Sequence, residues 1–423
     1  MKAMFCLAIL PRRGILPAKA YTRIQDGTQI DNGPFKTKLR STLSLFQDRS
    51  SRREEALFPL KLEPPHVGCY GVLKSPPLNL RGIFCSVFLL CAADLSAASR
   101  FVWETLPSLP DREGFAGAFA GVSEGVLLVA GGANFPGKKP WEGGKKVWYD
   151  TVFALEKPDG QWKVVGRLPR PLGYGIPVST KLGVVCIGGS DADRHYAETF
   201  MLALSNGVAR MPRLPSLPVP LANAAGALLG ETVLVCGGSD QPGERAALNR
   251  LFALDLLAAT PTWKELDPCP GQPRILPVAA ALDGAFYLVG GAALENTNGQ
   301  ISRVYLRDAW RYEPGRAWRR VADLPKPSVA APSPAPVFGS RFFIVGGDDG
   351  SLVGFKPVER HPGFPKTLLV YDTLKNEWSQ TGEVPAPRAT LPAVWWRDRF
   401  VLPSGEVRPG VRSPEVWTFR LNP

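Results

Sequence analysis

The chain has 423 residues, of which 45% are hydrophobic and 21% are charged, so it can bury a sizeable core. Gly and Pro together account for about one residue in five, which favours short strands and turns over a helical protein. Only 3 His are present and no CxxC pair occurs, which argues against a zinc ribbon, a haem protein or a histidine-rich metal enzyme.

The formal net charge of +12 is concentrated near the N-terminus, because residues 1–99 carry 14 Lys and Arg against 7 Asp and Glu. A nucleic-acid-binding protein needs a basic stripe on its folded part. We therefore expect no nucleic-acid partner.

Residues 1–79 show no sustained strand or helix period and mix Arg-rich with Pro-rich pieces. This composition predicts a disordered extension, or a stretch that lies upstream of the true start codon and is not made.

Residue Arg81 precedes an apolar run over 82–93, and the small residues Ser96-Ala97-Ala98 follow. These features are typical of a secretory signal peptide, and the run is too short to span a bilayer as a helix. We predict a signal peptide over 80–98, export to the periplasm or the exterior, and no membrane insertion after cleavage. The alternative for this run is a buried strand or helix.

Beyond residue 99 three cysteines remain, so at most one disulfide can form. Cys186 and Cys236 lie in apolar runs just before Gly-Gly pairs. A small buried hydrophobic residue suits that position, and we expect both to be core thiols.

A unit of about 54 residues repeats along the rest of the chain. Its clearest mark is an apolar strand that ends in two glycines, at Gly131-Gly132, Gly188-Gly189, Gly237-Gly238, Gly290-Gly291 and Gly346-Gly347. A sixth copy ends in Ser404-Gly405. A Trp follows four of the pairs, at Trp162, Trp263, Trp318 and Trp378, whereas the second unit has Met211 near that place.

Each unit reads as a four-stranded blade. A small, apolar strand A (222–228 and 277–282 are examples) is followed by strand B, which ends at the glycines, by strand C and by strand D with the Trp. These motifs resemble Kelch repeats, which form β-propellers. We expect an all-β fold, a six-bladed Kelch-type β-propeller over 99–423.

The two ends of this region complement each other. Residues 101–107 look like a strand D with nothing before it, whereas the last unit has strands at 390–396, 399–402 and 414–421 and then stops. We predict that the N-terminal strand completes the last blade, which closes the ring and removes its open edges.

The B–C loops over 132–149, 292–303 and 348–365 are the longest, and long loops mark a candidate functional face. Arg170, Arg274 and Arg388 each follow a Pro at the start of a strand A on that face. A ring of arginines would suit an anionic ligand. The alternative is that these arginines tie neighbouring blades together.

The sixth B–C loop differs from the others, because Glu406 directly follows the broken glycine pair. Pro409-Gly410 can bend the chain back and bring Glu406 and Arg412 to one side of a pocket. Taken alone, such a pair is most often a surface ion pair.

This Gly-Glu-x-x-Pro-Gly-x-Arg loop resembles the active-site loop of the sialic acid mutarotases (N-acetylneuraminate epimerases), six-bladed Kelch propellers exported to the periplasm. Residues 117–121, 129–135 and 214–220 are also similar to that family. The last segment looks like the start of the mature family protein but lies in mid-chain, which implies a cyclically permuted order of units.

The resemblance implies a mutarotase that interconverts the anomers of sialic acid or a related sugar acid without a cofactor or metal, as a monomer or weak dimer. Glu406 would be the proton acceptor and Arg412 would hold the substrate carboxylate. Tyr174, whose alternative role is core packing, is a candidate for protonating the ring oxygen, and Asn134 and Phe135 are candidates for lining the same mouth.

Two other functions fit a Kelch propeller. A copper radical oxidase needs two His and two Tyr ligands, but His195 and His361 are the only histidines of the propeller and no suitable Tyr–Cys set accompanies them. A non-catalytic module that binds a glycan or a protein is the remaining alternative, and a Glu406 that faces the axis would argue against it.

Overall fold

The structure is a computed structural model that describes residues 100–422 apart from Glu244. The predicted extension over 1–79 and the predicted signal peptide over 80–98 lie outside the described residues. Within the described part, every helix is too short or too polar to cross a membrane.

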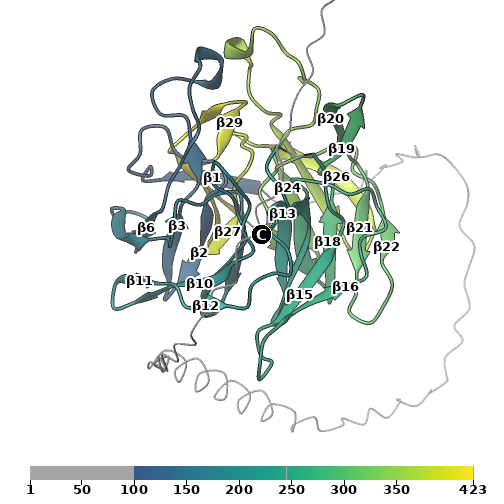
Figure 1. The fold of residues 1–423 in the computed structure, drawn as a ribbon, viewed down its shortest axis with the longest axis horizontal. Helices are drawn as coiled ribbons and strands as arrows, with labels where there is room; N and C mark the ends of the chain where they lie inside the picture. Colours follow the sequence, from purple (N-terminus) through teal and green to yellow (C-terminus); the bar gives the residue numbers. More distant parts are fainter. Residues whose placement is uncertain (1–99, 244, 423) are drawn as a thin grey trace, which may run out of the picture. The chain divides into compact units, whose positions relative to one another are not determined.

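Six antiparallel sheets surround a central axis (Figure 1), which confirms the predicted propeller. Blade 1 consists of β2 (Phe119–Ser123), β3 (Val126–Ala130), β6 (Thr151–Leu155) and β7 (Lys163–Arg167). Blade 2 consists of β8 (Ile176–Thr180), β9 (Gly183–Ile187), β10 (Thr199–Ser205), β11 (Val208–Arg210) and β12 (Arg213–Leu214). Blade 3 consists of β13 (Ala222–Leu229), β14 (Thr232–Ser239), β15 (Leu251–Asp255) and β16 (Trp263–Leu266).

The other three blades follow in chain order. Blade 4 consists of β17 (Val278–Leu282), β18 (Ala285–Val289), β21 (Ala309–Tyr312) and β22 (Arg319–Val321). Blade 5 consists of β23 (Val337–Phe338), β24 (Arg341–Val345), β25 (Thr367–Asp372) and β26 (Glu377–Glu383). Blade 6 consists of β27 (Val394–Trp396), β28 (Arg399–Pro403), β31 (Val416–Asn422) and β1 (Arg100–Leu106).

The N-terminal strand closes the ring as predicted. Strand β1 pairs with β31 over its whole length, from Arg100 opposite Asn422 to Leu106 opposite Val416. The pairing occupies the free edge of β31, which would otherwise expose unpaired N–H and C=O groups.

Four tryptophans each link their own blade to the one before it, in blades 1, 3, 4 and 5. The indole Nε1 of Trp162 donates a hydrogen bond of 2.7 Å to the Pro107 carbonyl, and Trp263 makes the same contact with Pro215 at 2.8 Å. Trp318 and Trp378 repeat it in blades 4 and 5. Each ring therefore fills space between two sheets while its N–H is satisfied.

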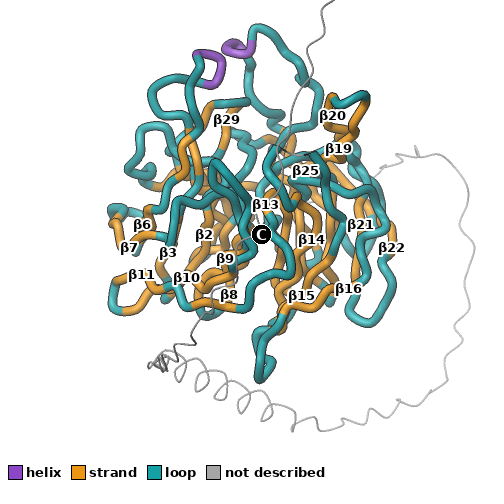
Figure 2. The backbone as a smooth tube through the Cα atoms, viewed as in Figure 1, coloured by secondary structure: helices purple, strands orange, loops and turns teal. Residues whose placement is uncertain are grey.

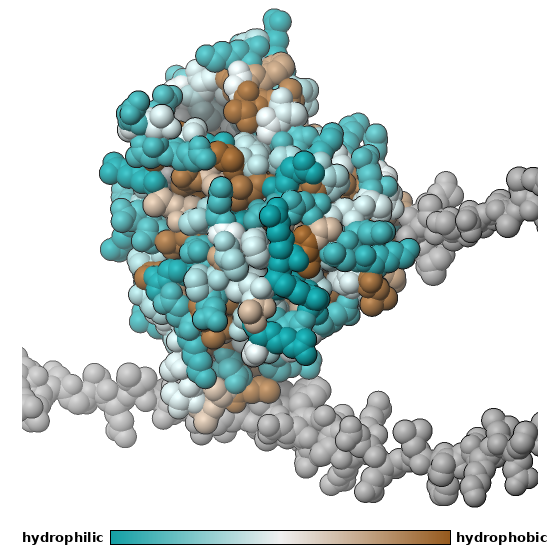
Figure 3. All heavy atoms as spheres, turned by 90° about the vertical axis from the view of Figure 1, so that its right-hand side faces the viewer, coloured by the Kyte–Doolittle hydropathy of each residue, from teal (hydrophilic) through white to brown (hydrophobic). Residues whose placement is uncertain are grey.

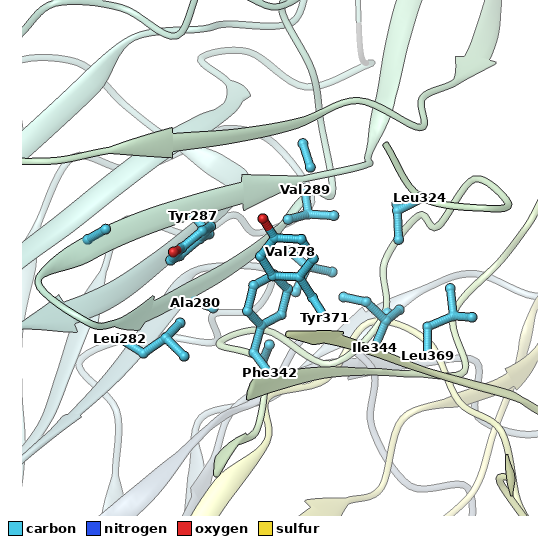
Figure 4. Packing of buried hydrophobic residues seen from close by; sticks show 14 residues of the cluster. Val278, Ala280, Leu282, Tyr287, Val289, Leu324, Phe342, Ile344, Leu369 and Tyr371 are labelled. Carbon is cyan, nitrogen blue, oxygen red and sulfur yellow. The ribbon is translucent and has the colours of Figure 1, made fainter. Parts of the chain in front are cut away.

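The core is a set of apolar layers between neighbouring sheets. Between blades 4 and 5, the rings of Tyr287, Phe342 and Tyr371 lie with centroids 5.1–5.9 Å apart. Cys186 and Cys236 are buried and free, as expected, and burial raises the pKa of both thiols. On the surface, the face drawn in Figure 3 is mainly hydrophilic. Figure 4 shows the aromatic layer of blades 4 and 5 from close by.

Additional short elements occur in the B–C loops, which carry the 3₁₀ turns η1 (Pro140–Glu142) and η2 (Val358–Arg360). Three small hairpins also lie there: β4 (Ala133–Asn134) with β5 (Val147–Trp148), β19 (Ala292–Thr297) with β20 (Gln300–Tyr305), and β29 (Glu406–Arg408) with β30 (Val411–Arg412). Figure 2 shows both 3₁₀ turns at the top of the view.

The innermost strand of blade 6 is shorter than the expected 390–396, since β27 covers only Val394–Trp396. Thr390 takes a left-handed backbone conformation with φ of 60°, which lies outside the β region. Pro392 then follows and has no N–H to donate to a ladder.

Candidate functional site

A closed ring of backbone hydrogen bonds surrounds the propeller axis. One residue at the start of each blade donates its N–H to the carbonyl of the equivalent residue in the preceding blade, over 2.7–2.9 Å. All six have φ between 53° and 66°, and they are Gly117, Tyr174, Asn223, Leu276, Ala330 and Thr390. The left-handed conformation is uncommon outside glycine, so tertiary hydrogen bonding maintains it here.

A cavity of about 310 Å³ lies against this ring, and all of the ring residues except Gly117 line it. Its walls come from the B–C loops, which was the expected functional face. Charged side chains in the lining are Lys146, Arg303, Asp348, Glu406 and Arg412. They come from blades 1, 4, 5 and 6, so only the closed propeller assembles them.

Glu406 and Arg412 lie opposite each other in the β29–β30 hairpin, and the structure brings both to the cavity. Arg412 Nη1 is 3.4 Å from Glu406 Oε1, and the two side chains are 4% and 17% exposed. The Gly410 N–H also donates to Oε1, over 2.6 Å. Within the described residues, Glu406 Oε2 has no hydrogen-bond donor, so one carboxylate oxygen is available to a ligand.

Ser404, which replaces the first glycine of the pair, anchors this hairpin. Its buried hydroxyl accepts a hydrogen bond of 2.6 Å from Phe115 N–H and donates one of 2.7 Å to the Ser413 carbonyl. The first bond joins blade 6 to the start of blade 1. The broken glycine pair is therefore a structural feature that holds the Glu406 loop in place.

Arg412 has hydrogen-bond donors that no acceptor among the described residues uses. Its guanidinium lies over the Phe135 ring at 4.7 Å, and Nη2 reaches the Tyr174 hydroxyl at 3.5 Å. Nε and Nη1 are buried and have no hydrogen-bond acceptor among the described residues. Buried donors without acceptors are unfavourable, and a planar guanidinium fits a carboxylate through two parallel hydrogen bonds. The geometry therefore suits an anionic ligand.

Lys146 is a second cation at the same place, which sequence reasoning missed. Its ammonium lies 5.0 Å from the ring centroid of Tyr174, 5.5 Å from that of Trp148 and 5.8 Å from that of Phe135. Aromatic faces attract cations, so these rings hold Lys146 beside Arg412. In the described part of the chain, no carboxylate forms an ion pair with it.

The three arginines proposed for a ligand funnel lie outside this lining. Arg274 is fully buried and makes a two-point contact with Asp308, at 2.8 and 2.6 Å. Arg388 pairs with Glu415 at 2.6 Å, and Arg170 pairs with Glu198 at 3.0 Å. In each case the acid lies just before strand C of the blade that the arginine leads into, while the backbones of Arg274 and Arg388 are hydrogen-bonded to the preceding blade. The contacts therefore fit the alternative interpretation, in which the arginines join blades.

Among the other candidates, Phe135 and Tyr174 line the cavity, whereas Asn134 does not. The Asn134 amide nitrogen donates to the Gly114 carbonyl at 2.9 Å, and its oxygen accepts from the Tyr149 hydroxyl at 2.9 Å. It is buried as a link within blade 1 and has no position at the mouth.

The loops of blades 1, 5 and 6 meet beside the cavity. Arg408 Nη1 donates to the Glu359 carbonyl over 2.6 Å, and its guanidinium lies 6.0 Å from the Trp141 ring. Gly410 packs so closely against Pro140 and Trp141 that a Cβ there would come within 3.1 Å of both. These contacts support the β29–β30 hairpin from two sides.

Comparisons with known proteins identify a family and a similar fold. A model of the N-acetylneuraminate epimerase family matches residues 92–207 and 214–356. The break falls next to Leu214-Pro215, where the cyclically permuted order is expected to restart, although the permutation itself stays a prediction. A solved protein structure, "Structure of YjhT", aligns with a TM-score of 0.55 over 74% of this chain and 95% of its own, at 13% identity. At that identity it supports the fold alone.

Curated relatives match over parts of the chain. The N-acetylneuraminate epimerase of Haemophilus influenzae (strain PittEE) is 29% identical over 227 residues, which cover 48% of this chain and 58% of that protein. The one from Yersinia enterocolitica (serotype O:8 / biotype 1B) is 46% identical over 93 residues, or 19% and 23% of the two chains. The chain thus spans little more than half the length of the first relative. Because the family model covers more than half of the chain, the chain belongs to the N-acetylneuraminate epimerase family.

Proposed function

We propose that the protein is a mutarotase that interconverts the α and β anomers of N-acetylneuraminate or a related sugar acid. The observation that carries this proposal is the placement of Glu406 next to a buried Arg412 with unused donors. In a 2-keto sugar acid the carboxylate and the anomeric hydroxyl share one carbon. An arginine that binds the carboxylate therefore brings the hydroxyl to the neighbouring base.

The reaction needs one proton removed and one delivered. Glu406 takes the proton of the anomeric hydroxyl, the bond between the anomeric carbon and the ring oxygen breaks, and a carbonyl forms while the ring oxygen gains a proton. Closure on the opposite face of the carbonyl reverses both transfers. We assign the second proton to Tyr174, whose hydroxyl is 3.5 Å from Arg412 Nη2 in the same cavity.

The cavity supports an anionic monosaccharide as the ligand. Lys146, Arg303 and Arg412 outnumber Asp348 and Glu406 in its lining. Its volume of about 310 Å³ lies at the small end of ligand pockets. All of these residues belong to one chain, so we expect a monomer or weak dimer to be active.

The test is exchange between the two anomers of N-acetylneuraminate, followed by NMR with and without protein. Glu406→Gln keeps the shape of the side chain but removes the base, so the rate should fall by about 10²–10⁴ while binding is largely kept. Arg412→Lys loses the planar fork and should weaken binding of the sugar acid more than that of a neutral sugar. Arg170→Lys, outside the cavity, is the matched control.

Circular dichroism should show that all three variants are folded. If Glu406→Gln exchanges anomers at the wild-type rate, the catalytic assignment is wrong. A propeller that binds a glycan or protein without catalysis then becomes the better interpretation.

We also propose that the protein is exported. The support is the apolar run over 82–93 followed by Ser96-Ala97-Ala98, a pattern typical of signal peptides. We expect the mature chain to begin near Ser99. N-terminal sequencing of protein from the periplasm or medium checks this, and finding residues 1–78 on that product would contradict it.

A further inference from the structure

Two carboxylates occupy equivalent positions in neighbouring blades. Asp348 directly follows Gly346-Gly347 in blade 5, just as Glu406 follows Ser404-Gly405 in blade 6. Each forms an isolated β-bridge to the residue that precedes a ring residue, Asp348 with Val329 and Glu406 with Ala389. In the other four blades the same position holds Ala or Ser. Both acids line the one cavity, and the proposed reaction uses only Glu406.

The carboxylate of Asp348 is held by a donor on each oxygen. The Tyr305 hydroxyl donates to Oδ2 over 2.6 Å, and the Gly350 N–H donates to Oδ1 over 3.0 Å. Gly350 has φ of 78°, and a Cβ there would come within 2.9 Å of the Tyr305 ring. The loop is therefore built so that Tyr305 and the backbone both reach Asp348.

The Tyr305 hydroxyl stays protonated and so remains a hydrogen-bond donor to Asp348. Burial raises the pKa of its hydroxyl, and the hydrogen bond to Asp348 raises it further. The hydroxyl proton is therefore committed to Asp348. Each carboxylate oxygen can accept more than one hydrogen bond, so Asp348 keeps acceptor capacity toward the cavity.

We infer that Asp348 determines substrate specificity by accepting hydrogen bonds from hydroxyl groups of the sugar on the part remote from its carboxylate. Arg412 and Lys146 come from blades 6 and 1 and share the Phe135 ring, whereas Asp348 comes from blade 5. Arg412 and Lys146 together attract the substrate carboxylate to the side of blades 6 and 1, which leaves Asp348 to face the rest of the sugar. The hydroxyl-bearing part then extends toward blades 4 and 5.

This inference rests on the proposed function for the identity of the ligand, but it is tested by binding. The probes are N-acetylneuraminate and an analogue whose hydroxylated side chain is shortened. Dissociation constants for both are measured by NMR titration with wild-type protein, Asp348→Asn, Tyr305→Phe and Asp349→Asn. Asp349 is the matched control, because it lies next to Asp348 but outside the cavity lining and contacts Ser351.

Wild-type protein should bind the shortened sugar roughly 10–100-fold more weakly, as expected for lost hydrogen bonds to a charged group. Asp348→Asn should bring this ratio close to one, Tyr305→Phe should reduce it partly, and Asp349→Asn should leave it unchanged. If Asp348→Asn does not fold, Tyr305→Phe alone decides. An unchanged ratio in the folded Asp348 and Tyr305 variants would overturn the inference.

Failure of the proposed function has a different signature, since wild-type protein would then not accelerate anomer exchange although it binds the sugar. If wild-type protein binds neither sugar, both the proposed function and the role of Asp348 are wrong.

Discussion

Replacing Asp308 with Asn would leave the Arg274 guanidinium buried without its counter-ion. Arg274 is fully buried and Asp308 is 15% exposed, and two hydrogen bonds of 2.8 and 2.6 Å join them. The guanidinium would keep the neutral amide oxygen at position 308 and the backbone acceptors at Gly290 and Gln272, but it would have no anionic partner. Breaking a buried pair by removing one partner costs about 3–5 kcal/mol of unfolding free energy, a large part of the stability of a typical domain.

Urea denaturation of wild-type protein and Asp308→Asn measures this loss. The matched control is Glu198→Gln, which removes the equivalent acid from the pair with Arg170. That pair is 34% and 50% exposed at its two side chains, and exposed pairs contribute about 0–1 kcal/mol. A loss below 1 kcal/mol for Asp308→Asn would refute the assignment of Arg274 to blade cohesion. Ligand affinity of the folded Asp308 variant should equal that of wild type, since neither residue lines the cavity.

The same pair predicts a pH dependence. Burial by itself would raise the pKa of Asp308, but the hydrogen bonds and charge of Arg274 outweigh it and hold the pKa below its usual value. The stabilisation is then fully present above the unfolded-state pKa of about 3.9 and is lost as pH falls through the lower folded-state pKa. The stability gap between wild type and Asp308→Asn should therefore narrow below about pH 4, and a gap that widens there would contradict this reasoning.

Other predictions concern ring closure, the small cavity in blade 2, and Lys146 between its aromatic rings. Deleting β1 removes seven paired positions, worth roughly 3.5–10 kcal/mol at 0.5–1.5 kcal/mol per hydrogen bond, and an unchanged melting temperature would show that β1 is not needed. Met211→Trp should fill part of the cavity of about 100 Å³ in blade 2 and add about 0.5–2 kcal/mol in urea denaturation, whereas a loss would mean that Trp does not fit there. Lys146→Gln should weaken binding of N-acetylneuraminate in an NMR titration without lowering thermal stability, and unchanged affinity would exclude Lys146 from the anion site.

Much of the fold could be read from local sequence signals. A strand that ends in two glycines, a Trp at a set distance and a lone strand around Trp103 are each requirements of a single blade, so they are visible without tertiary information. Glu406 and Arg412 could also be predicted from the sequence, because both lie in one short hairpin and the Pro409-Gly410 pair between them predicts its bend.

Asp348 and Lys146 were missed for different reasons. Asp348 did have a signal, since it occupies the position of Glu406 in the preceding repeat. Lys146 had none, because its aromatic neighbours Phe135, Trp148 and Tyr174 come from both sides of a long loop and from the next blade. A cation in a long loop is ordinarily exposed, and only packing distinguishes this one.

Local sequence patterns predicted six blades, their closure by the N-terminal strand and the candidate site loop that carries Glu406 and Arg412. Tertiary structure decided which charged side chains face the cavity. Arg170, Arg274 and Arg388 have the same sequence context, yet each turns away from the cavity to an acid that lies just before strand C of the blade it leads into. The direction of such a side chain depends on a partner about half a repeat away in the chain, at 27 to 34 residues. Strand pairing brings that partner close, and local sequence does not predict it.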